Sequence, residues 1–172
     1  MGEALGQERE AKKKVMVAID ENESSHYALM WTLENLKESI TKSSLVIFMA
    51  QPAPNNNYSL GASLGTARLY CPLSATPDWP NSVHENHRKF TLALLEKAND
   101  ICASQGVKAE TVTDVGDPGT AICDAVQKHN INFLVLGDWG LGKIKRAFLG
   151  SVSNYCVHNA KCPVLVVKKP DY

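Results

Sequence analysis

Short apolar runs alternate along this chain with longer stretches in which apolar residues recur every three or four positions. The runs predict five strands, at residues 15–19, 45–50, 111–115, 133–136 and 164–167. Four of them are almost wholly apolar, as expected for parallel strands that are covered on both faces. The run at 111–115 alternates polar and apolar residues instead, so it predicts a strand at the edge of the sheet.

Helical periodicity fills the intervals between these strands. Apolar residues at helical spacing predict one helix over 29–40 and a second over 94–102, which ends at Gly106. Asp117 followed by proline predicts the start of a third helix, and residues 152–156 a short fourth. Strictly alternating strands and helices indicate an α/β fold, a doubly wound parallel sheet with right-handed crossovers and helices on both faces.

The length of 172 residues and a hydrophobic content of 44% suit one domain, which we expect to span residues 13–170. We expect residues 1–12, at the start of the chain, to form a disordered tail. Residues 52–82 hold five of the eight prolines and therefore predict a mobile, irregular insertion.

Charge and cysteine content exclude several classes of protein. The 18 basic and 18 acidic residues cancel, which argues against nucleic acid or an anionic membrane as a partner. Apolar runs are too short for a membrane span, and no apolar signal segment follows the first residue. The five cysteines include no C-x-x-C pair, so they predict reduced thiols and no metal site. Together these features predict a protein of the cytoplasm, with the nucleus as an alternative.

Candidate chemistry lies where ligands bind such sheets, beyond the carboxyl ends of the strands. Residues 18–20 end the first strand, residues 137–142 follow the fourth with three glycines, and residues 150–153 begin the last helix. Glycines let backbone amides approach an anion, which a helix N-terminus also attracts. The pattern predicts a phosphate site with Lys143 as counter-charge, although ordinary turns and a helix cap remain an open alternative. A Walker A loop and a dinucleotide fingerprint are both missing.

The spacing Gly137-x2-Gly140-x9-Gly150-Ser151 resembles the signature of the universal stress protein family. The resemblance extends over residues 13–169, through the opening strand at 15–20, residues 115–118 and the closing strand at 162–167, and is greatest to single-domain plant members of the ATP-binding branch. It implies a Rossmann-like fold of the adenine nucleotide alpha hydrolase type, with strand order 3-2-1-4-5.

The resemblance also implies a nucleotide site that takes ATP or AMP, with or without Mg²⁺. The base would face Ala18, Ile19 and Asp20, with Ala50 and Gly116 nearby. The residues expected around the ribose and phosphates are Gly137, Gly140, Gly142, Lys143, Gly150, Ser151, Val152 and Ser153. Asp20 alone is equally typical of a residue at a helix N-terminus.

This chain departs from the family pattern between the first two signature glycines. Asp138 and Trp139 stand where relatives carry a small hydroxyl residue followed by Arg or His. A carboxylate beside a polyphosphate is repulsive unless a cation intervenes. Asp138 therefore points away from the phosphates, holds Mg²⁺ or weakens binding, and Trp139 either stacks on a base or packs against the fold.

The last strand, formed by Val164, Leu165, Val166 and Val167, lies at a sheet edge in the implied order and is wholly apolar until Lys168. An uncovered apolar edge promotes aggregation, so we expect a homodimer in which the same strand of a second copy covers it. The overall hypothesis is a dimeric, adenine-nucleotide-binding regulator of the stress response or a chaperone-like protein, with unidentified clients and no assigned catalytic residue. The alternatives are a slow Mg²⁺-dependent ATP hydrolase, in which Asp138 is the candidate group, and a nucleotide-free scaffold.

Overall fold

A computed structural model describes residues 12–53, 79–138 and 149–170 of the chain. All five strands are parallel and form one sheet in the order β3-β2-β1-β4-β5, which confirms the expected topology and the edge position of residues 109–115. The strands are β1 (Lys14–Ala18), β2 (Ser44–Gln51), β3 (Ala109–Val115), β4 (Phe133–Gly137) and β5 (Val164–Val167).

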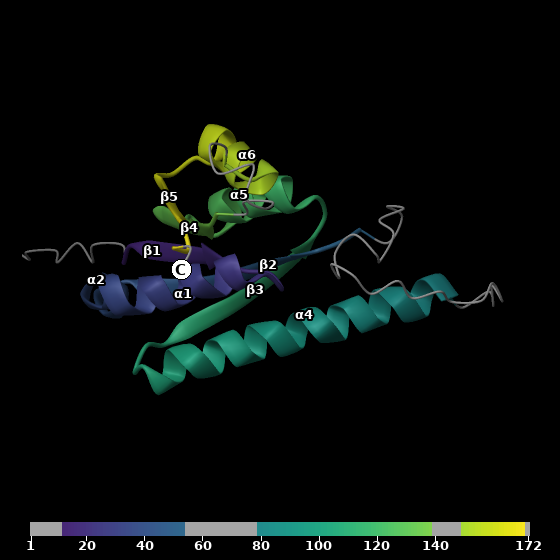
Figure 1. Cartoon of the computed structure of the whole chain (residues 1–172), viewed down its shortest axis with the longest axis horizontal. Helices are drawn as coiled ribbons and strands as arrows, with labels where there is room; N and C mark the ends of the chain where they lie inside the picture. Colours follow the sequence, from purple (N-terminus) through teal and green to yellow (C-terminus); the bar gives the residue numbers. More distant parts are fainter. Residues whose placement is uncertain (1–11, 54–78, 139–148, 171–172) are drawn as a thin grey trace, which may run out of the picture.

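Helices cover both faces of the sheet (Figure 1). On one face lie α1 (Glu23–Asn35), α2 (Lys37–Lys42) and α4 (Trp79–Ser104), and on the other α5 (Pro118–Lys128) and α6 (Ser151–Asn159). Side chains of β1 alternate between the two cores. Val15 and Val17 pack under α1 and α4, while Met16 and Ala18 pack under α5 and α6. Burial on both faces is the reason that these strands are continuous apolar runs.

The first helical stretch differs from the single helix that its periodicity predicts. Helix α1 ends at Asn35, and α2 begins at Lys37, because Leu36 between them leaves helical geometry with φ −112° and ψ 15°. Leu33 and Ile40 nevertheless enter the same core from the two helices. The apolar spacing therefore identified the buried face but not the break.

Helix α4 begins at Trp79, within the stretch that the prolines predict to be irregular. Pro80 is the second residue of the helix. An N–H at this position has no acceptor within the helix, so proline, which lacks one, is tolerated there. At its other end α4 is closed as expected by Gly106, whose φ of +73° is a left-handed conformation that glycine adopts at low cost. No helix in the three described ranges is both long and apolar enough to cross a membrane.

Candidate functional site

The carboxyl ends of the inner strands meet at one edge of the sheet. Ala18 at the end of β1 is level with Phe48 on β2 and Leu136 on β4. The amide of Ile19 continues the ladder by donating to the Phe48 carbonyl at 2.8 Å. The chain then leaves the sheet at Asp20, so the three residues expected at the base lie between the ends of two neighbouring strands.

Ala50 and Gly116 lie further along the same edge. Ala50 is half-buried near the end of β2, level with Asp114 of β3. The Gly116 amide, just beyond β3, donates to the Gln51 carbonyl at 2.9 Å. Both residues thus lie at the strand ends on the β2–β3 side, one or two strands away from β1.

Helix α6 directs its N-terminus toward the end of β4. The Ser153 hydroxyl, 1% exposed, donates to the Gly137 carbonyl at 3.0 Å and so fixes the first turn of the helix against the strand. The first intrahelical bond runs from the Asn154 amide to the Gly150 carbonyl, and no side chain of the described residues caps the helix. Within the same ranges nothing accepts from the amides of residues 151–153, and amides in this position attract an anion.

Gly137 is required by packing against α1. A Cβ on this residue would lie 2.4 Å from the carbonyl oxygen of Ser24 and 2.8 Å from the amide nitrogen of Ser25. Both contacts are with backbone, which cannot rotate away. The glycine thus lets the first turn of α1 approach the end of β4. The segment after β1 and the segment after β4, both expected in the site, therefore lie close together.

Asp20 organises the turn between β1 and α1. Its carboxylate accepts from the Asn22 amide at 3.0 Å and from the Asn22 side chain at 2.8 Å. Burial raises the pKa of Asp20, and hydrogen bonds from Ser25 and Asn22 partly offset that effect. The carboxylate thus holds the turn that precedes α1 and does not cap the helix itself, and the main chain of Asp20 stays at the strand end.

Ser25 is a site residue that the sequence analysis missed. It is 1% exposed, accepts from the Asp20 amide at 3.0 Å and lies within hydrogen-bonding distance of the carbonyls of Asp20 and Asn22. A hydroxyl three positions after the N-cap residue Asn22 was the available signal, since such positions close the first turn of a helix.

Glu21 adds a second carboxylate beside Asp20. Burial raises its pKa, and the neighbouring charge of Asp20 raises it further, whereas His87 of α4 acts in the opposite direction. Both acids line a pocket of about 240 Å³ between α1 and α4, whose floor includes Leu29 and Leu94. Glu23 and one lysine, Lys97, line the same pocket, so carboxylates outnumber lysines among the described residues of its lining.

Asp138 follows Gly137 and is held in place by β5. Its amide donates to the Val167 carbonyl at 2.9 Å, and its Oδ2 lies 3.9 Å from the ammonium group of Lys168. The side chain is only 15% exposed. Its Oδ1 is enclosed and accepts no hydrogen bond from the described part of the chain. Asp138, one of the two residues that depart from the family pattern, thus lies at the strand ends. The other, Trp139, lies outside the described residues, as do Gly140, Gly142 and Lys143.

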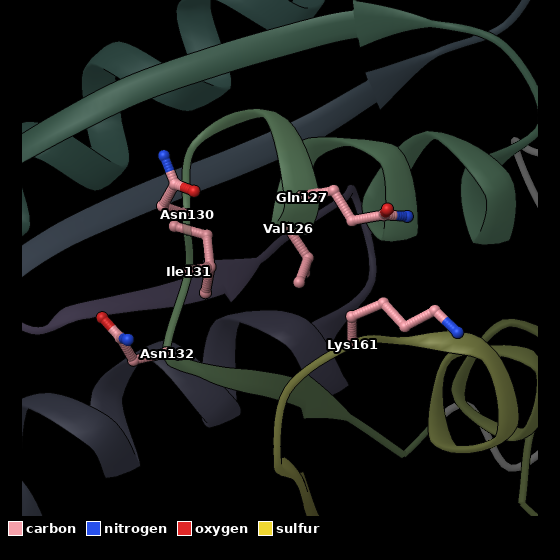
Figure 2. Close-up of a pocket in the computed structure, with 6 residues that line it drawn as sticks. All are labelled: Val126, Gln127, Asn130, Ile131, Asn132 and Lys161. Carbon is pink, nitrogen blue, oxygen red and sulfur yellow. The ribbon is translucent and has the colours of Figure 1, made fainter.

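A larger hollow, of about 330 Å³, lies elsewhere (Figure 2). It is formed by the end of α5, the loop that leads into β4 and Lys161 before β5. Asn132 in this hollow accepts from the Lys14 amide at the start of β1, so the hollow is at the amino ends of the strands. None of the predicted site residues lines it.

The edge strand β5 presents an apolar surface. Val164, Leu165 and Val166 are half-buried, and β4 is the only strand of the described sheet that pairs with β5. The Leu134 amide donates to the Pro163 carbonyl and the Asp138 amide to the Val167 carbonyl. The backbone groups of the odd-numbered residues therefore point toward β4. Because hydrogen-bonding direction alternates along a strand, Val164 and Val166 direct their backbone groups to the free edge.

Comparison with known proteins matches residues 12–168 to a family model described as "Universal stress protein family". A relative named universal stress protein A-like protein, from Arabidopsis thaliana, is 30% identical over 166 residues, covering 91% of this chain and 90% of the relative. A solved Arabidopsis universal stress protein family structure with AMP bound is 27% identical, covers 92% of each chain and has a TM-score of 0.64. The UspA structure from Lactobacillus plantarum, 16% identical, shares the fold with a TM-score of 0.69 and covers 91% of this chain and 99% of its own.

Proposed function

This chain belongs to the universal stress protein family, and from that premise we propose that it binds an adenine nucleotide at the carboxyl ends of its strands. The observation that carries the proposal is the Ser153–Gly137 hydrogen bond, which holds the N-terminus of α6 against the end of β4; no described side chain caps that terminus. A phosphate group supplies the charge that such a terminus attracts. The AMP found in the Arabidopsis structure is a ligand of this kind.

In this proposal the base lies against the end of β1, and the phosphate lies at α6. Residues 18–20 contact the base through backbone groups, with Ala50 and Gly116 on the β2–β3 side. Gly137 and residues 150–153 surround the ribose and phosphate, together with Gly140, Gly142 and Lys143. The ligand is AMP or ATP.

Mg²⁺ is the cation that this site would accept. Its preferred ligands are oxygens, and Asp138 Oδ1 is an enclosed carboxylate oxygen for which the described residues provide no donor. The described ranges contain no cluster of three or more His, Cys, Asp or Glu side chains suited to a metal, so phosphate oxygens would complete the coordination. Bound there, Mg²⁺ would neutralise charge between Asp138 and the nucleotide.

Freshly purified protein tests the proposal directly. We expect mass spectrometry of the denatured protein to release an adenine nucleotide, and calorimetry of the stripped protein to give saturable binding of AMP or ATP. Guanosine monophosphate is the matched control and should bind at least tenfold more weakly. If neither measurement detects an adenine nucleotide, the chain is a nucleotide-free scaffold.

We further propose that two copies pair through β5 and that the dimer acts as a stress-response regulator or chaperone-like protein. The free backbone groups of Val164 and Val166 and the apolar side chains of this edge support pairing across a two-fold axis. Nucleotide occupancy would act on clients by favouring one of two conformations of the dimer.

Val166→Pro tests the dimer because it removes an N–H at the free edge. Proline is tolerated on an edge strand, so the fold should survive. By sedimentation or light scattering we expect the wild type at twice the chain mass and the variant as a monomer at micromolar concentration. Val166→Thr, which keeps the N–H and the shape, should remain a dimer. A monomeric wild type or a dimeric proline variant would exclude this interface.

A further inference from the structure

We propose that Asp138 makes the site selective for a nucleoside monophosphate over a nucleoside triphosphate when no divalent cation is present. The inference rests on the proposed function, since it assigns the ligand class of that same site. It starts from Asp138, an acidic residue that directly follows Gly137 at the end of β4.

The direction of the Asp138 side chain follows from its neighbour. A Cβ on Gly137 would point into the first turn of α1. The ladder continues through Asp138, whose amide pairs with Val167, so its side chain points to the opposite face of the sheet. That is the face covered by α5 and α6, where Ser153 attaches the first turn of α6 to Gly137. Asp138 and the N-terminal amides of α6 therefore lie on the same side of the strand ends.

The surroundings of Asp138 neutralise its charge only in part. Lys168 lies 3.9 Å from Oδ2, a distance longer than a hydrogen bond, and its side chain is 62% exposed to water. Oδ1 has no donor among the described residues. A carboxylate that is enclosed on one oxygen and weakly paired on the other presents negative charge to any anion nearby.

Other charged groups at the strand ends strengthen this effect. Asp20, Glu21 and Glu23 line the pocket between α1 and α4, and Lys97 is the one described lysine that lines it with them. Lys169 is already paired with Glu23. One phosphate can be accommodated by the α6 amides, but each further phosphoryl group adds negative charge near the partly neutralised carboxylate of Asp138.

Titration calorimetry in EDTA tests the inference. We expect wild-type protein to bind AMP at least tenfold more tightly than ATP, and Asp138→Asn to reduce that ratio to threefold or less, chiefly by improving the affinity for ATP. Asp138→Glu, which keeps the charge, should retain the preference. Glu38→Gln, which removes one exposed carboxylate on α2 at the other end of the sheet, is the matched control and should leave the ratio unchanged.

Asp138→Ser provides a second variant if the asparagine disturbs the fold, and it should also abolish the preference. Equal affinities of the wild type for AMP and ATP would overturn the inference while leaving the proposed function intact. An unchanged ratio in Asp138→Asn and Asp138→Ser would overturn it in the same way. Failure of wild type and both variants to bind any adenine nucleotide would overturn the proposed function and, with it, this inference.

Discussion

Ser151→Asp should weaken AMP binding about 30- to 150-fold without loss of stability. Ser151 is exposed in the first position of α6, where its amide has no acceptor among the described residues. A carboxylate placed there faces the ligand's charge, and a repulsion of about 2–3 kcal/mol is typical of charges a few ångströms apart near a protein surface. The same carboxylate is favourable for the helix dipole by about 0.3–1 kcal/mol, so the melting temperature should stay constant or rise.

Ser151→Asn separates charge from shape in this experiment, because asparagine has nearly the same size as aspartate. Its AMP affinity, measured by calorimetry, should stay within about threefold of wild type, in keeping with the loss of at most one neutral hydrogen bond. If aspartate and asparagine have the same effect, the phosphate does not lie at the N-terminus of α6.

Gly137→Ala should lower the free energy of unfolding by about 3 kcal/mol. The added methyl group meets the carbonyl of Ser24 at 2.4 Å, and relief requires α1 to move away from β4. For a chain of this length, such a loss corresponds to a fall in melting temperature of about 6–12 °C, measurable by circular dichroism or calorimetry.

Gly119→Ala is the matched control for that substitution. Its Cβ would lie 2.8 Å from Cδ1 and 3.3 Å from Cβ of Tyr155, so the exposed tyrosine has to shift outward, whereas no backbone stands in the way. Alanine is the better helix former by about 1 kcal/mol, which offsets part of that cost. We expect a change in unfolding free energy of less than about 1 kcal/mol. Equal losses for the two variants would show that the close approach of α1 to Gly137 does not limit stability.

Periodicity predicted the strands well because burial on both faces leaves a strong apolar signal. The runs at Val15 and Phe133, for example, mark β1 and β4 to within about a residue. Periodicity was less informative at Leu36, where the apolar face continues while the backbone turns between α1 and α2. A single residue of non-helical backbone leaves no mark in the apolar pattern.

The candidate site was predictable only in part. Residues 18–20 and 150–153 stand out by residue type, and the family resemblance joined them to Ala50 and Gly116. Ser25 was missed because its hydrogen bonds serve the backbone of a turn, for which the residue type alone is a weak signal. The pairing of Asp138 with Lys168 was not foreseeable either, because no local pattern relates these two residues.

By itself, the order of apolar and polar residues determined that this chain builds a doubly wound parallel sheet, since the inner strands bury both faces and each helix buries one. Tertiary structure alone decided what the conspicuous residues do. Gly137 meets α1, Asp20 holds the turn that precedes α1, and Asp138 lies beside Lys168. Such roles depend on contacts between segments distant in sequence, and only the packed sheet brings those segments within reach of one another.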